Sequence, residues 1–219
     1  MKSSTLTSLC ALMFCTSCLT SEEPPLVEYR FTAEQLAWQP YRTGDVLRFG
    51  NDHNNRIRTY KIPEIVDVME EMSTGSVYIP LPVRRQTAVL VQRIAVRMQR
   101  TDSVTSRIPL LNLQLSYNPD RKAPSLIFSE LSWEGFYKAT LPIDSVNGGK
   151  PINQRYYQGV SLLPTLTVGP TTYQQVLVAE NSYPQLTLPG VRLVSRLYYA
   201  RQRGVVGFVE GGTLWYKLP

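Results

Sequence analysis

The chain has 219 residues, of which 43% are hydrophobic, so it can bury the core of one large domain or two small ones. Its 23 lysines and arginines exceed its 17 acids and give a net charge of +6, but they are scattered, whereas nucleic-acid binding usually needs a continuous basic stripe. All three cysteines, Cys10, Cys15 and Cys18, lie near the N-terminus, which excludes disulfides, cysteine-ligated zinc and cysteine nucleophiles from the rest of the chain.

Residues 1–17 have the features of a signal peptide. A positively charged start at Met1-Lys2 is followed by a mostly apolar run, Leu6–Phe14, and by the small residues Thr16 and Ser17. The apolar run is too short to cross a bilayer as a helix. We therefore expect this segment to direct export and to be cleaved.

Cys18 stands directly after the expected cleavage site. Small residues that lead to a cysteine resemble the signal of bacterial lipoproteins, and this resemblance implies that Cys18 is lipidated and becomes the new N-terminus. Cys15 occupies the position where that pattern has an aliphatic residue, which is a departure. A signal peptide without lipidation is the alternative.

Residues 18–28 are expected to form the lipidated cysteine and a flexible tether. The segment contains Glu22-Glu23 and Pro24-Pro25, and the prolines favour an extended path. Acidic residues after the cysteine resemble the export signal of surface lipoproteins in Bacteroidota-type bacteria, although an ordinary acidic spacer is equally consistent. We expect an outer-membrane lipoprotein that faces the periplasm or the cell surface.

The domain is expected to begin at residue 29 with one turn of helix and then strands. Thr32 and Gln35 have the spacing of a capping box. The segment Gly50–Asn55 is rich in glycine, asparagine and aspartate, so it predicts a hairpin turn. The returning strand, Ile57–Met69, contains Pro63, which predicts a bulge or an edge position.

Two central segments show the alternation of half-buried strands. In Gln86–Arg100, apolar Ile94, Val96 and Met98 alternate with polar or small residues. A helix is the rival interpretation there, because several of the residues are good helix formers. Ile108–Tyr117 alternates leucine with polar residues more regularly.

The remaining strands are short apolar segments between turn residues. Val146–Pro151 is expected to be a loop. The expected strands are Ser125–Trp133, Phe136–Pro142, Tyr156–Val168, Tyr173–Glu180, Val191–Ala200, Val205–Val209 and Leu214–Leu218. About ten short strands predict an all-β fold, an antiparallel half-barrel, barrel or sandwich, in a single domain over residues 29–219.

Three residues near the C-terminus are expected to be structural. Trp215, on the closing strand, should bury its ring. Gly204 and Gly207 flank Val205-Val206 in a hairpin. If Gly204 has a positive φ, asparagine should be tolerated there better than valine, because asparagine visits the left-handed region more readily.

The C-terminal half resembles a group of uncharacterised, secreted β-rich lipoproteins from Bacteroidota-type bacteria. The resemblance rests on Gly169–Val178, on the hairpin Tyr198–Phe208 and on Leu214–Tyr216. Gln202 and Arg203 make the turn of that hairpin longer than in the usual pattern. The resemblance implies a fold but no catalytic residue.

No catalytic, metal or cofactor site is predicted. His53, the only histidine, lies in the polar turn at residues 51–55, where a stable metal site would need more converging ligands. Histidine is the commonest general acid–base, and no nucleophile motif accompanies this one. Paired carboxylates remain open, because any two of the 17 acids could converge.

Two functions follow from these observations. The first is a non-catalytic, envelope-anchored lipoprotein that binds a ligand, an envelope protein or a glycan through a β surface, without nucleic acid. The paired tyrosines Tyr156-Tyr157 and Tyr198-Tyr199 support it, since on a strand one ring of each pair faces outward. The alternative is a glycan or peptide hydrolase that uses a carboxylate pair.

Overall fold

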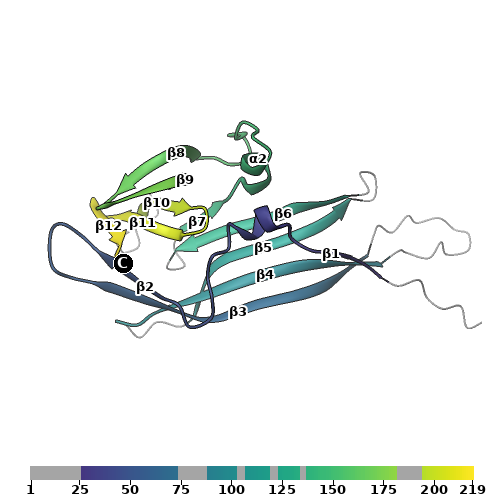
Figure 1. Ribbon diagram of the computed structural model, residues 1–219, viewed down its shortest axis with the longest axis horizontal. Coiled ribbons are helices and arrows are strands. Elements are labelled where there is room, and N and C mark those ends of the chain that lie inside the picture. The colour runs from purple at the N-terminus through teal and green to yellow at the C-terminus, as the bar shows by residue number, and fades with distance from the viewer. Residues whose placement is uncertain (1–25, 74–87, 103–106, 119–122, 134–136, 182–193) are drawn as a thin grey trace, which may run out of the picture.

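A computed structural model describes residues 26–73, 88–102, 107–118, 123–133, 137–181 and 194–219 (Figure 1). This part of the chain is nearly all strand, which confirms the predicted all-β class. Its elements are β1 (Val27–Tyr29), α1 (Ala33–Leu36), β2 (Val46–Gly50), β3 (Arg58–Ser73), β4 (Ala88–Arg100), β5 (Ile108–Asn118), β6 (Ala123–Trp133), β7 (Tyr137–Thr140), α2 (Ile143–Asn147), β8 (Val160–Val168), β9 (Thr171–Glu180), β10 (Val194–Ala200), β11 (Gly204–Glu210) and β12 (Thr213–Lys217).

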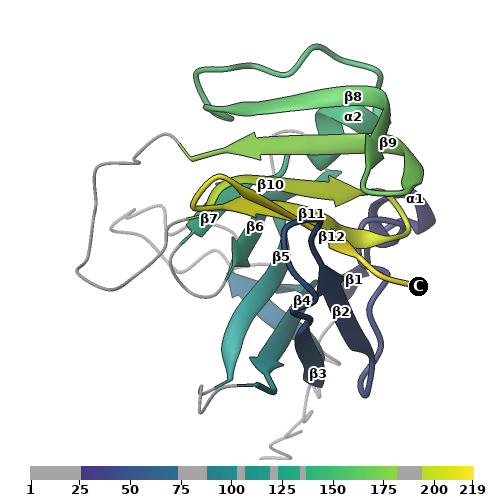
Figure 2. The same ribbon diagram turned by 90° about the vertical axis from the view of Figure 1, so that its left-hand side faces the viewer.

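The strands form one sheet that curls into a nearly closed barrel. Their order is β7-β6-β5-β4-β3-β2-β12-β11-β10-β9-β8, and the pairs along this path are antiparallel. The last strand, β12, pairs with the early strand β2, which joins the two halves of the chain (Figure 2). Of the three architectures that the sequence left open, the barrel is therefore the one observed.

Local sequence explains several of these elements. The side chain of Thr32 accepts a hydrogen bond from Gln35 N at 3.2 Å, and Gln35 Oε1 accepts one from Thr32 N at 3.0 Å, so the predicted capping box begins α1. In β3 the pairing with β4 shifts between Lys61 and Glu64, which places the predicted bulge at Pro63. The segment that ends at Arg100 is a strand and not a helix.

Two expectations were wrong. The loop predicted to start at Val146 begins inside helix α2, which buries Ile143 and packs against α1 and β6. Tyr156 and Tyr157 lie in a turn before β8 and not on a strand, so strand alternation does not set their exposure. In both places tertiary contacts and turn geometry override a short local pattern.

The main core lies inside the barrel and is rich in aromatic rings. Trp133 lies 4.9 Å from Phe208, 5.0 Å from Tyr60 and 5.5 Å from Phe49, centroid to centroid. All four rings have no solvent exposure. Burial on this scale is the dominant favourable contribution to folding.

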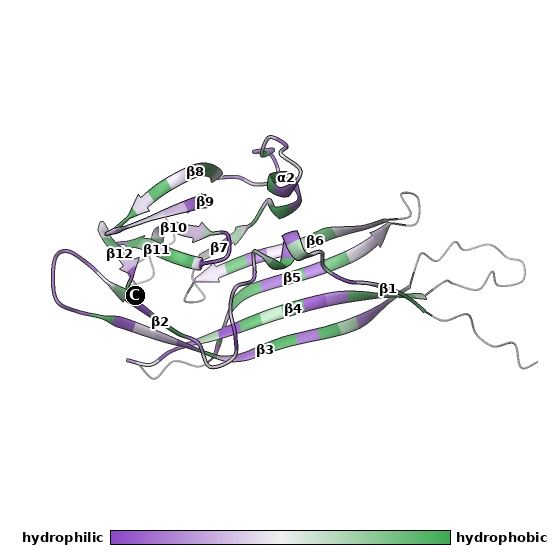
Figure 3. Cartoon of the chain, in the orientation of Figure 1, coloured by the Kyte–Doolittle hydropathy of each residue, from purple (hydrophilic) through white to green (hydrophobic). Residues whose placement is uncertain are grey.

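A second, smaller core covers the opposite face of β8–β12. It consists of Val168, Val176, Val178, Ala200 and Val206. Strand β11 lies between the two cores and is buried on both faces, which fits its almost continuous apolar sequence (Figure 3). Tyr199 accordingly faces the main core while Tyr198 packs on the second, as predicted for a pair on a strand.

Candidate functional site

The structure places the predicted structural residues in the C-terminal hairpins. Trp215 is 6% exposed, so its predicted burial is confirmed. A β-carbon at Gly207 would lie 2.7 Å from Val168 Cγ1 and 2.8 Å from Trp215 O, which shows why this position has no side chain. Gly204 has φ +73°. Cys18 lies outside the described residues.

One pocket lies beside Trp215 and contains a buried ion pair. Its volume is about 310 Å³, and Arg58, Arg100, Asp102, Glu210 and Trp215 are among its lining residues. Arg58 donates to both carboxylate oxygens of Glu210, and its guanidinium carbon lies 4.2 Å from the Trp215 ring centroid. Each charge is therefore satisfied within the protein.

Asp102 and Glu210 both line this pocket, so they are a candidate carboxylate pair for the hydrolase alternative. Asp102 accepts a 2.9 Å hydrogen bond from Arg100, and this bond is the main cause that lowers the pKa of Asp102. A glycosidase pair needs one carboxyl group that stays protonated, so that it can donate a proton to the leaving group. The pKa of Asp102 is shifted in the opposite direction, and the Glu210 carboxylate forms an ion pair with Arg58.

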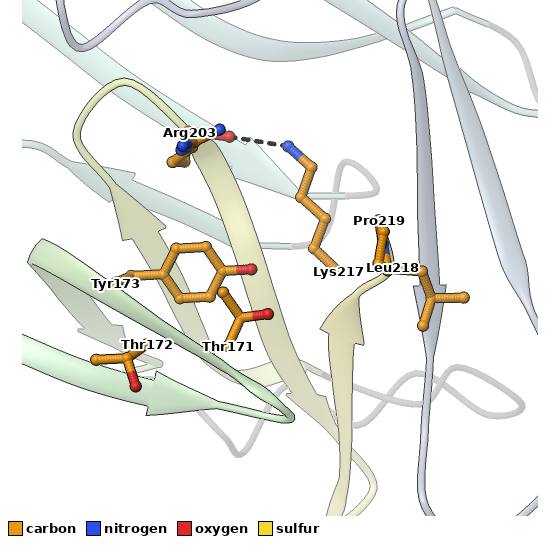
Figure 4. A pocket seen from close by; sticks show the side chains of 7 residues that line it. All are labelled: Thr171, Thr172, Tyr173, Arg203, Lys217, Leu218 and Pro219. Atoms are coloured by element: carbon orange, nitrogen blue, oxygen red, sulfur yellow. Dashed lines mark hydrogen bonds between the residues drawn. The ribbon is translucent and has the colours of Figure 1, made fainter.

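A second pocket lies where β9 begins, beside the β10–β11 turn and the end of β12. Its volume is about 400 Å³, and it is lined by Thr171, Thr172, Tyr173, Arg203, Lys217, Leu218 and Pro219. Figure 4 shows the side chains of Thr171 and Tyr173 pointing from β9 toward the Lys217 side of the pocket. None of the lining side chains is acidic. We call this hollow the Lys217 pocket.

The Lys217 ammonium contacts the backbone of Arg203, the second cationic residue of the pocket. Lys217 Nζ donates a hydrogen bond to the backbone oxygen of Arg203 at 3.0 Å. Burial lowers the pKa of Lys217, the Arg203 charge lowers it further, and Asp45 acts against both. The pocket therefore holds a half-buried ammonium beside a second positive charge.

The turn that carries Arg203 is fixed by contacts with the N-terminal segment. Gln202, with φ 61°, donates its backbone N–H to Ala37 O at 2.7 Å, directly after α1. Arg203 N donates to Ala200 O at 3.1 Å, which closes the turn. The sequence indicated that Gln202 and Arg203 lengthen the turn of this hairpin but contained no signal that would place the turn beside Lys217 or Tyr173.

The predicted polar turn after β2 is present. The buried Asn51 side chain accepts hydrogen bonds from the backbone N–H groups of His53 and Asn54, each at 3.0 Å, and His53 itself is exposed. No group of three or more metal-ligating side chains occurs within the described ranges. Both helices in the described part of the chain are far shorter than a bilayer-spanning helix.

No protein-family model matches this sequence, and comparisons with curated proteins and with solved structures gave no match either.

Proposed function

We propose that the protein is an envelope-anchored, non-catalytic lipoprotein that binds a ligand in the Lys217 pocket. The single observation that carries the binding proposal is this hollow of about 400 Å³, which combines cations and hydroxyl groups without an acidic side chain. A concave site with a few converging polar groups is the usual form of a ligand site. The signal at residues 1–17 and the resemblance to β-rich lipoproteins support the anchor at Cys18 and a place in the outer membrane.

The absence of catalysis is the second half of this proposal. Asp102 and Glu210 are each engaged by an arginine, as described above, and the lining of the Lys217 pocket contributes no carboxylate side chain or histidine. General acid–base chemistry near neutral pH would have no tuned group in that pocket except Lys217. We therefore expect binding without turnover.

Two substitutions test the binding site without assuming the chemistry of the ligand. Thr171 and Thr165 are exposed residues of the same β8–β9 hairpin, but Thr165 pairs with Gln174, and neither Thr165 nor Gln174 lines the pocket. Thr171→Trp should fill the pocket and abolish capture of an envelope component by the purified lipoprotein, whereas Thr165→Trp should leave capture unchanged. Equal capture by both variants would exclude this pocket as the binding site.

The anchor and the lack of turnover have separate tests. Mass spectrometry of the mature N-terminus should find a lipidated Cys18, and Cys18→Ser should leave the chain unanchored or uncleaved. An unmodified terminus at another residue would contradict the anchor. Incubation with peptidoglycan, polysaccharides, peptides and esters should give no product, and turnover that disappears on substitution of one Asp or Glu would establish the hydrolase alternative.

A further inference from the structure

We propose that the Lys217 pocket recognises a phosphate group on a small polar molecule of about the size of a sugar phosphate, with Lys217 and Arg203 as the anion-binding groups. This inference rests on the proposed binding function and adds the chemical class of the ligand. It concerns the pocket lining alone and is independent of the anchor at Cys18.

The Lys217 pocket carries positive charge that no ion pair within the described residues neutralises. Neither Lys217 nor Arg203 has an ion pair with a carboxylate of the described residues, and none of the pocket's side chains is acidic. Arg58, Arg93 and Arg196, by contrast, each contact a glutamate within 2.7 Å. The Arg203 charge disfavours the charged form of Lys217, and an anion bound by both groups would remove that cost.

Lys217 and Arg203 also have N–H groups available to a ligand. An ammonium has three N–H groups, and Lys217 directs one of them to Arg203 O, so two remain for a ligand. The Arg203 guanidinium makes no hydrogen bond with the described residues and can offer a fork of N–H groups. Together these donors can serve the three terminal oxygens of a phosphate, and the Arg203 fork matches two of those oxygens at once.

Thr171 and Tyr173 add hydroxyl groups to the lining of the pocket. The hydroxyl groups of Thr171 and Tyr173 have no hydrogen-bond partner among the described residues, and both point toward Lys217 (Figure 4). The Tyr173 ring is half-buried and packs on the second core, which holds its position. A pocket of about 400 Å³ has room beyond the phosphate for a polar group that contacts these hydroxyls.

Binding of an anion should change the protonation of Lys217. Burial and then Arg203 lower its pKa, so the folded protein favours the neutral amine more than an exposed lysine would, although Asp45 opposes this effect. A phosphate dianion next to Nζ would raise the pKa again. Binding should therefore take up protons when the solution pH is near the lowered pKa of Lys217.

Isothermal titration of the full-length lipoprotein in detergent with glucose 6-phosphate, inorganic phosphate, glucose and glucuronate tests the proposal. We expect glucose 6-phosphate to bind more tightly than inorganic phosphate, and glucose and glucuronate to bind at least tenfold more weakly. Arg203→Gln and Lys217→Met should each weaken glucose 6-phosphate binding at least tenfold, while the exposed-site controls Arg155→Gln and Lys150→Met should not. Proton uptake, measured in buffers of different ionisation enthalpy, should disappear in Lys217→Met.

Arg203→Gln is the more decisive variant, because the Arg203 side chain is exposed and its backbone oxygen, which Lys217 uses, is unchanged. Unchanged binding in Arg203→Gln, or equal binding of glucose and glucose 6-phosphate, would overturn the inference. If no phosphate binds but Thr171→Trp still abolishes capture of an envelope component, the inference fails and the proposed function stands. If Thr171→Trp has no effect on capture or on phosphate binding, both fail.

Discussion

The phenol of Tyr41 lies directly over Gly204, in the position that a side chain at residue 204 would need. A β-carbon there would overlap the Tyr41 hydroxyl and would lie 2.5 Å from Tyr41 Cζ. The same hydroxyl accepts a hydrogen bond from Val205 N at 2.8 Å. Tyr41 therefore fixes the start of β11 and at the same time restricts residue 204 to glycine.

We predict that Gly204→Asn and Gly204→Ala each lower the free energy of unfolding by roughly 2–5 kcal/mol, because positive φ and overpacking both contribute. Gly212 separates the two effects, since it has φ +81° but open space around a β-carbon. Gly212→Asn should cost less than about 1 kcal/mol, because asparagine tolerates this conformation. Urea denaturation of the three variants gives the comparison.

The expectation from sequence that asparagine is milder than valine at Gly204 considered φ alone, and it stays a prediction. The Tyr41 ring adds a cost that asparagine and valine share, because every side chain except that of glycine begins with a β-carbon. Similar stabilities for Gly204→Asn and Gly212→Asn would show that the Tyr41 contact is unimportant.

Stability should fall steeply above about pH 10, the ordinary pKa of tyrosine. Burial raises the pKa of Tyr41 and of Tyr199 well above that value, so both stay protonated in the folded protein while the unfolded chain loses the two protons. The stabilisation is complete below pH 10 and is lost as the pH rises. The slope should approach about 2.7 kcal/mol per pH unit, because each of the two protons contributes about 1.36 kcal/mol per pH unit.

Tyr199→Phe provides the control for this pH dependence. The variant loses the hydrogen bond from the Tyr199 hydroxyl to Trp38 O, so it should be less stable at neutral pH. It should also lose about half of the alkaline slope, because one of the two titrating groups is gone. Denaturation curves between pH 8 and 11 with equal slopes in both proteins would contradict the assignment to these tyrosines.

Trp215→Ala should lower the free energy of unfolding by about 3–5 kcal/mol, the usual range for removal of a buried aromatic ring. The ring stacks on Phe208 at 6.0 Å between centroids and covers the Arg58 guanidinium. Tyr156 is 70% exposed, so Tyr156→Ala is the matched aromatic control and should change stability by less than about 0.5 kcal/mol. Thermal melting measures both, and equal melting temperatures would refute the structural role of Trp215.

Asp144→Ala should cost about 1–2 kcal/mol, because Asp144 links three elements through exposed hydrogen bonds. Its carboxylate accepts from Gln35 Nε2 in α1 at 2.8 Å and from Leu126 N in β6 at 3.1 Å. Ser145→Ala, one residue along α2, is the control and should have a smaller effect. Amide hydrogen exchange at Leu126 should accelerate in Asp144→Ala only, and unchanged exchange would contradict the link.

Local patterns in the sequence were sufficient to predict most strands and the start of α1. Alternation identified β4 and β5, proline at residue 63 identified the bulge, and Thr32 with Gln35 identified the capping box. These features depend on side-chain periodicity, backbone φ and hydrogen bonds between near neighbours, all of which are encoded within a few residues. The lipid anchor at Cys18 is likewise read from a local motif and stays a prediction.

Only the tertiary structure decided that the sheet closes into a barrel, that Tyr41 lies over Gly204, and that Arg203 lies beside Lys217. Each of these depends on segments distant in sequence, such as the pairing of β12 with β2. A β-strand pattern specifies which face is buried but not which strand will be its neighbour. Helix α2 escaped prediction for the same reason, since its five residues are stabilised by Gln35, Leu126 and Trp38 rather than by their own periodicity.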